Sequence, residues 1–133
     1  MAYVLIIDDD EDFADVAKKV LEGAGHEVRV DLDLKSGTES MSQRRPDLVI
    51  LDVMFPENAS GGFELARTIK HYDADLKGIP ILMLTAVNAR FPLGFSSRDI
   101  DDTWLPVEDF LEKPVDFDTM LGKVTRLLEK TEA

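Results

Sequence analysis

Five short apolar runs, rich in β-branched residues, constrain the fold of this chain more than any other feature of its sequence. They cover residues 3–7, 27–32, 47–51, 79–84 and 107–111. Runs of this length are typical of β-strands, and we interpret each one as a strand that is buried on both faces of a sheet. Burial of that kind is found mainly in parallel sheets that helices cover on both sides.

Segments with apolar residues at helical spacing lie between these runs. In three of them the apolar residues recur at steps of three and four, which predicts amphipathic helices. Their apolar positions are Phe13, Val16, Ala17, Val20 and Leu21 in the first, Phe63, Leu65, Ala66 and Ile69 in the second, and Met120, Leu121, Val124, Leu127 and Leu128 in the third. We expect Gly23 and Gly25 to end the first of these helices, and Asp116 to open the last.

A further helix is expected over residues 35–45, where the pattern is weaker. Ser36 followed by Glu39 fits a capping box, which indicates a helix start. Met41 is the only large apolar residue in the segment. We therefore expect this second helix to be poorly buried.

Alternating strands and helices predict the fold class, because consecutive parallel strands are joined by right-handed helical crossovers. We expect an α/β fold with a doubly wound, five-stranded parallel sheet. Residues 87–106 must supply the fourth helix, but Pro92 and Gly94 interrupt them, so this helix should be short or irregular. A chain of 133 residues has the size of one domain, and we assign residues 1–133 to a single domain.

The charge composition excludes several classes of function. The chain has 27 acidic and 15 basic residues, and the resulting net charge of -12 would repel a nucleic-acid backbone or an anionic lipid surface. There is no cysteine, which excludes disulfides, thiolate metal sites and cysteine nucleophiles. The apolar run at the N-terminus is too short for a signal peptide or a membrane span. We expect a cytoplasmic protein that binds neither nucleic acid nor membranes.

Chemically active side chains follow four of the five predicted strands. In open parallel sheets, ligands bind beyond the carboxyl ends of the strands, near the point where the strand order reverses. The residues at these ends are Asp8, Asp9 and Asp10 after the first strand, Asp52 after the third, Thr85 after the fourth and Lys113 after the fifth. We expect these side chains to meet at one edge of the sheet.

This combination of side chains fits phosphoryl transfer. Clustered carboxylates repel one another by about 1–4 kcal/mol a pair, so a hard cation such as Mg2+ should neutralise them and keep coordination positions open for phosphate oxygens. A lysine ammonium and a threonine hydroxyl can both bind a phosphoryl group. An aspartate can itself be the nucleophile and form an acyl phosphate.

Four motifs in this order resemble the receiver domain of two-component response regulators. They are Ile6-Ile7-Asp8-Asp9-Asp10, Leu51-Asp52-Val53-Met54-Phe55-Pro56, Leu84-Thr85-Ala86 and Asp109-Phe110-Leu111-Glu112-Lys113-Pro114. The resemblance covers essentially the whole chain and implies a flavodoxin-like fold of five strand–helix units. It also implies that Asp52 accepts a phosphoryl group from a sensor histidine kinase or a phosphotransfer protein. Asp8 and Asp9 would bind Mg2+ together with Asp52 and the backbone carbonyl of Met54.

The same resemblance assigns roles to three further residues. Thr85 and Lys113 would contact the phosphoryl group, and Phe110 would be the aromatic residue that rearranges on activation. Strand alternation places Phe110 on the opposite face from Leu111 but leaves its burial undecided. The signal would then pass to an unknown downstream protein by phosphorylation-dependent contact, and the chain would act as a stand-alone receiver rather than as an enzyme.

Two other functions remain open from the sequence. The first is a Mg2+-dependent hydrolase that works through an aspartyl phosphate. Such enzymes resemble a pattern with a second aspartate two residues after the nucleophile, where this chain has Met54. The second is a receiver-like scaffold that works without phosphorylation, although a scaffold has no need of the complete set of active-site residues.

Overall fold

The structure is a computed structural model that describes residues 2–52, 61–69, 78–86 and 109–132. In chain order its elements are β1 (Tyr3–Ile7), α1 (Glu11–Gly23), β2 (Glu27–Asp31), α2 (Leu34–Gln43), β3 (Leu48–Asp52), α3 (Gly61–Arg67), β4 (Ile81–Ala86), β5 (Asp109–Lys113) and α4 (Phe117–Glu132). The five strands form one parallel sheet in the order β2-β1-β3-β4-β5. The predicted α/β class and the five-stranded parallel sheet are confirmed.

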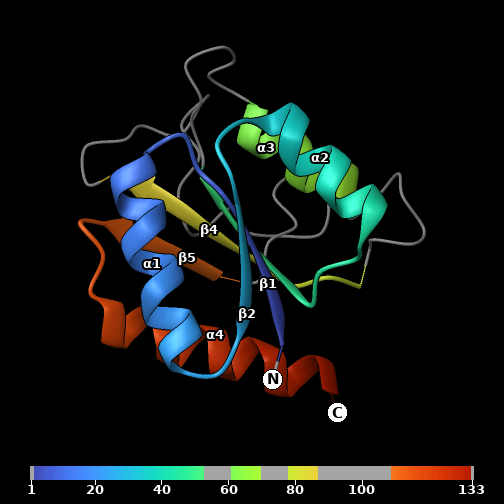
Figure 1. Ribbon diagram of the computed structural model, residues 1–133. Helices are drawn as coiled ribbons and strands as arrows, with labels where there is room; N and C mark the ends of the chain where they lie inside the picture. The colour runs from blue at the N-terminus through green and yellow to red at the C-terminus, as the bar shows by residue number, and fades with distance from the viewer. Residues whose placement is uncertain (1, 53–60, 70–77, 87–108, 133) are drawn as a thin grey trace.

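Helices cover both faces of the sheet, α1 and α4 on one side and α2 and α3 on the other (Figure 1). Side chains of the central strands alternate between the two layers. On β1, Leu5 and Ile7 pack on the α2 and α3 side, whereas Val4 and Ile6 pack on the α1 and α4 side. All four are fully buried, and burial of such a side chain stabilises the fold by about 1.5–3 kcal/mol. The double layer holds the strand ends rigidly in place.

The predicted burial on both faces is wrong for β2, because β2 is an edge strand of the sheet. Its side chains alternate instead, with Glu27 and Arg29 exposed and Val28 buried. Three other strands extend further toward their carboxyl ends than predicted. Most of the extra residues, which include Asp52 and Lys113, are polar, but they still pair with the neighbouring strand because backbone pairing does not depend on side-chain polarity.

Aspartates begin the first two helices. Asp10 caps α1, where its Oδ1 accepts a hydrogen bond from the Phe13 amide at 3.1 Å. Asp33 caps α2 in the same way and accepts from the Ser36 amide at 2.7 Å. The predicted capping box of Ser36 and Glu39 is therefore wrong, because α2 begins at Leu34, three residues earlier than that prediction requires. The predicted end of α1 is confirmed at Gly23, and Gly25 follows with a φ of 96°.

A close contact fixes α2 against the end of β1. A Cβ atom added to Gly37 would lie 2.5 Å from Ile7 Cδ1, so only glycine fits at this crossing. Three residues further along α2, the Ser40 hydroxyl donates a 2.6 Å hydrogen bond to Asp31 Oδ2. These contacts hold the carboxyl ends of β1 and β2 together, next to the residues that follow β1. They also explain how a helix with little apolar surface stays docked.

No described helix has the length and apolar character needed to span a membrane. The irregular helix predicted within residues 87–106 lies outside the described residues.

Candidate functional site

Three aspartates meet where the strand order reverses, between β1 and β3. Asp8 and Asp9 follow β1, and Asp52 is the last residue of β3. One carboxylate oxygen from each lies within 4.8 Å of the other two. We call this group the carboxylate cluster. Asp8 and Asp52 are buried and Asp9 is exposed, so the cluster reaches solvent through Asp9.

Among the described residues, the Lys113 ammonium is the one cation that contacts the carboxylate cluster. Lys113 is the last residue of β5, and its Nζ lies 2.8 Å from Asp8 Oδ2. The other oxygen of Asp8 accepts a 2.9 Å hydrogen bond from the Asp10 amide. Among the described donors, none reaches Asp8 Oδ2 with hydrogen-bond geometry, so the contact with Lys113 is an ion pair alone. This buried oxygen has lone pairs to offer a cation.

The backbone of Asp8 is fixed as well as its side chain. Its amide donates a 3.1 Å hydrogen bond to the carbonyl of Asp31, which continues the pairing of β1 with β2. The Asp31 side chain is in turn held by Ser40 of α2. Hydrogen bonds therefore connect Ser40 of α2, through Asp31, to Asp8 of the carboxylate cluster.

The cluster carries more negative charge than Lys113 balances. Burial, followed by the charge on Asp8, raises the pKa of Asp52 to about 7, although Lys113 lowers it. Burial also raises the pKa of Asp8 above its ordinary value, against the opposing effect of Lys113. Burial alone would lower the pKa of Lys113, but its contact with Asp8 and the charges of both buried aspartates raise it. All three shifts indicate a site that is short of positive charge.

A hard divalent cation fits this arrangement. Such ions prefer carboxylate oxygens, and Mg2+ is commonly bound through one or two carboxylates while it keeps waters or substrate oxygens. The cluster supplies three carboxylates within one ion's reach, and one buried oxygen lacks a hydrogen bond among the described residues. Of the predicted ligands, Asp8, Asp9 and Asp52 are brought together. The fourth predicted ligand, the backbone carbonyl of Met54, lies outside the described residues.

β4 carries Thr85 to the same edge of the sheet, where its backbone pairs with Glu112 beside Lys113. Thr85 thus lies at the edge of the sheet that the sequence predicts, although it belongs to β4 instead of following it. Phe110 is buried in the apolar layer on the α2 and α3 side, and Leu111 packs in the opposite layer. The structure settles the burial that strand alternation left open, whereas rearrangement of Phe110 on activation stays a prediction.

The sequence missed one neighbour of the site. Phe13 of α1 was interpreted only as a core position, but the Lys113 ammonium lies over its ring, 4.9 Å from the ring centre. Phe13 also has an aromatic neighbour. The ring of Phe117, in α4, is stacked on the Phe13 ring with centroids 6.0 Å apart. Helical spacing gives no sign of this contact, because it joins residues a hundred positions apart in the sequence.

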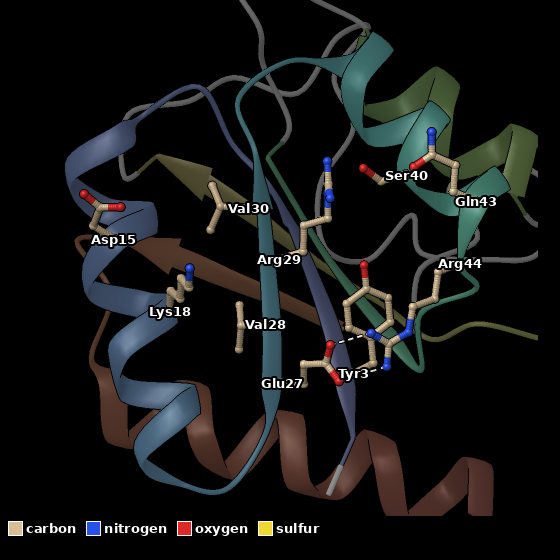
Figure 2. Close-up of a pocket in the computed structure, with 10 residues that line it drawn as sticks. All are labelled: Tyr3, Asp15, Lys18, Glu27, Val28, Arg29, Val30, Ser40, Gln43 and Arg44. Carbon is tan, nitrogen blue, oxygen red and sulfur yellow. Dashed lines mark hydrogen bonds and ion pairs between the residues drawn. The ribbon is translucent and has the colours of Figure 1, made fainter.

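A second group of charges lies at the outer edge of β2 and lines a cavity of about 440 Å³ (Figure 2). Here the charges are matched. Arg44 pairs with Glu27 and lies 4.0 Å over the Tyr3 ring, and Arg29 Nε is 3.3 Å from Asp31 Oδ2. Among the described residues that line this cavity, none belongs to the carboxylate cluster.

Comparisons with known proteins agree with this geometry. The model of the response regulator receiver domain family matches residues 4–125. The DNA-binding dual master transcriptional regulator RpaA of Synechocystis sp. is 36% identical over 99% of this chain, which spans 51% of that protein. Protein PilH of Pseudomonas aeruginosa is 28% identical, and the match covers 96% of this chain and 98% of PilH.

The chain spans about half the length of most of the curated relatives it matches, PilH being an exception. Among solved structures, a putative response regulator from Chloroflexus aurantiacus has a TM-score of 0.80 at 30% identity, over 96% of this chain and 98% of that one. This similarity confirms the flavodoxin-like fold that the motifs implied. The chain belongs to the receiver domains of two-component response regulators.

Proposed function

We propose that this receiver domain accepts a phosphoryl group on Asp52, with Mg2+ bound by Asp8, Asp9, Asp52 and the Met54 carbonyl. The observation that carries the proposal is the convergence of three carboxylates and one ammonium at the reversal of strand order. Bound Mg2+ would supply positive charge for the carboxylates and for the oxygens of the incoming phosphoryl group.

In the reaction, a carboxylate oxygen of Asp52 attacks the phosphorus atom of the donor. A P–O bond forms on Asp52, while the bond between phosphorus and the leaving group breaks and its electron pair departs with the leaving group. The leaving group is an imidazole when the donor is a phosphohistidine, and acetate when it is acetyl phosphate. Asp52 must be ionised to attack, and cation binding favours that state because it offsets the burial that raises the pKa of Asp52 to about 7.

Lys113 is proposed to move from Asp8 to an oxygen of the phosphoryl group. Its ammonium is a mobile point charge on a flexible stem, and only an ion pair ties it to Asp8. Thr85 is proposed to donate its hydroxyl proton to another oxygen of the same group, and Phe110 to rearrange in response. The resulting shift in conformation requires that the phosphoryl group interact differently with the two states.

The biological setting forms part of the proposal. The donor is a sensor histidine kinase or a phosphotransfer protein, and the product signals through contact with a downstream protein. Residues 1–133 are proposed to act as one receiver domain that works in the cytoplasm.

The two rival functions are less well supported. A scaffold that worked without phosphorylation would gain nothing from buried, mutually repelling carboxylates, which lower the stability of the fold. A hydrolase would need a general acid near the nucleophile, and the position two residues after Asp52 is Met54. A thioether has no proton to donate.

The test of the proposal is incubation of the chain with acetyl phosphate and Mg2+, followed by intact mass measurement. We expect the mass of one phosphoryl group to be added, and we expect EDTA to prevent the addition. A control receiver domain establishes that the conditions are adequate. If that control is modified while this chain keeps its mass, the proposed function is wrong.

A further inference from the structure

We propose that Phe13 is a positioning residue for phosphoryl transfer, because its ring holds the Lys113 ammonium in place by a cation–π interaction. The proposal rests on the proposed function, since Lys113 acts on the phosphoryl group only if Asp52 accepts one. It assigns a task to a helix residue whose spacing in the sequence indicates nothing more than core packing.

The contact between the two side chains is specific. The Lys113 Nζ lies over the Phe13 ring at 4.9 Å from the centroid, within the distance at which an aromatic face attracts a cation. The same Nζ is 2.8 Å from Asp8. The Lys113 side chain is 20% exposed, so water screens these attractions only in part.

The position of the ring is itself well defined. Phe13 lies in the first turn of α1, where its amide is bound by the Asp10 cap at 3.1 Å. Its ring is stacked on Phe117, in the first turn of α4, with an angle of 20° between the planes. Both rings pack against the apolar layer on the α1 and α4 side. The ring is thus supported by two helices and by a cap next to the carboxylate cluster.

The ring becomes important when Asp8 binds a cation. Lys113 then competes with that cation for Asp8 and needs another group to keep it near the phosphoryl oxygens. A lysine stem has four rotatable bonds, and ordering it costs up to about 2 kcal/mol in side-chain entropy. An aromatic face attracts the ammonium without forming strong directional hydrogen bonds, so the N–H groups stay available for the phosphoryl group. Lys113 would therefore be oriented before the reaction begins.

The simpler interpretation is that Phe13 only fills space between α1 and α4. An aliphatic side chain would serve that purpose nearly as well. The two interpretations differ in whether the electron density of the ring matters, and substitution by fluorinated phenylalanines separates them. Fluorine withdraws electron density from the ring face, and it changes the ring's shape and its apolar character little.

The experiment places phenylalanines with increasing numbers of ring fluorines at position 13 alone, and measures the rate of phosphorylation by acetyl phosphate at saturating Mg2+. We expect the rate to fall stepwise with fluorination, by about two- to fivefold for the most fluorinated ring, as a cation–π interaction of about 0.5–1 kcal/mol implies. Phe13→Leu should lower the phosphorylation rate by a similar factor. Phe13→Trp should keep the rate near that of the wild-type chain, because the indole ring also attracts a cation. Mg2+ affinity should stay constant along the fluorinated series, and stability should fall by no more than the weakened cation–π interaction itself accounts for, which excludes a larger effect through packing.

A second measurement does not depend on phosphorylation. In the chain without donor, NMR signals of the Lys113 methylene protons nearest the ammonium should be shifted upfield by the Phe13 ring current. In Phe13→Leu they should return to ordinary lysine values. Unshifted signals in the wild-type chain would overturn the inference even if Asp52 accepts phosphate normally.

The outcomes separate the two proposals. If the wild-type chain is phosphorylated on Asp52 but the rate is the same for every ring at position 13, the inference is wrong and the proposed function stands. If the wild-type chain is never phosphorylated although a control receiver is, the proposed function is wrong, and the role of Phe13 in phosphoryl transfer falls with it.

Discussion

The two ends of β5 both carry ion pairs, but their charge balance is opposite. At the amino end, the carboxylate of Asp109 is shared by Lys123, at 3.1 Å, and Arg126, so one acid meets two bases. Lys123 also donates a 2.7 Å hydrogen bond to the carbonyl of Phe110. At the carboxyl end, Lys113 is the one cation among the described residues that faces the three acids of the carboxylate cluster.

Burial increases the difference between these ends. The side chains at the amino end are 21–57% exposed, and ion pairs of that kind contribute about 0–1 kcal/mol each to stability. Asp8 and Asp52 at the other end are buried, and their unbalanced charge lowers stability until a cation or a proton offsets it. A satisfied ion pair thus indicates structure, whereas a buried excess of one charge indicates a binding site.

Substitutions at the two ends of β5 should differ most in their effect on phosphorylation. Asp52→Asn should abolish the phosphoryl adduct formed with acetyl phosphate and Mg2+, because the amide is not a nucleophile toward phosphorus. Asp109→Asn removes the same charge from the other end of β5 and should leave the adduct intact. Intact mass measurement distinguishes the two variants. Equal loss of the adduct in both would show that overall charge, not the cluster, controls the reaction.

The next effect is on Mg2+ affinity. Asp9→Ala removes one ligand of the proposed site and should weaken binding about tenfold or more, since loss of even an outer partner costs 10–100-fold. Asp109→Ala serves as the matched control and should bind Mg2+ normally. Calorimetric titration measures both. Unchanged affinity in Asp9→Ala would remove that residue from the site.

Mg2+ affinity should also depend on pH. The pKa of Asp52 without metal is about 7, so a proton competes with the cation below that pH and binding should strengthen as the pH rises through 7. Affinity that is flat between pH 5.5 and pH 8 would contradict the raised pKa.

Stability should respond with opposite signs at the two ends of β5. The raised pKa of Asp52 means that the folded state binds a proton more tightly than the unfolded state does. The free energy of unfolding should therefore fall as the pH rises from 3.8 to about 7, and the penalty is fully present above that range. Without metal at pH 8, Asp52→Asn should therefore gain about 1–3 kcal/mol of stability.

Asp109→Asn should instead lose about 0.5–1 kcal/mol of stability, because it removes a partner from Lys123 and Arg126. Urea denaturation in EDTA compares the two variants under the same conditions. Saturating Mg2+ should cancel the gain in Asp52→Asn, since wild-type stability then increases by cation binding. A loss of stability in both variants would mean that the cluster is balanced after all.

The smallest expected effect is that of salt. At about 1 M salt the Debye length is about 3 Å, so the exposed pairs of Asp109 should contribute almost nothing and the penalty of Asp109→Asn should shrink toward zero. The buried carboxylates should be screened far less, and the gain in Asp52→Asn should largely remain. Repeating the urea titrations at low and high salt tests this difference.

The strands and the cluster were predictable because their determinants are local. Short apolar runs specify strands, and in a parallel sheet the residues after each run must meet at one edge, which is how Asp8, Asp52 and Lys113 could be placed together. The edge position of β2 was not predicted. Its charged residues alternate with valines, which is the pattern of a strand with one open face.

The errors arise where a contact depends on distant parts of the chain. Asp33 rather than Ser36 caps α2, a helix whose Gly37 lies against Ile7 of β1. Phe13 meets Lys113 only after α1 has packed on the sheet that contains β5. No spacing rule connects residues so far apart in sequence, and only the folded chain reveals the contact.

Mapping of the phosphorylated residue tests the central claim most directly. The chain is treated with acetyl phosphate and Mg2+, the acyl phosphate is reduced with borohydride, and the altered residue is located by peptide sequencing in a mass spectrometer. The account predicts a single altered aspartate, Asp52, and no alteration when EDTA replaces Mg2+. Alteration at Asp8 or Asp9, or at Asp52 with equal yield in EDTA, would contradict it.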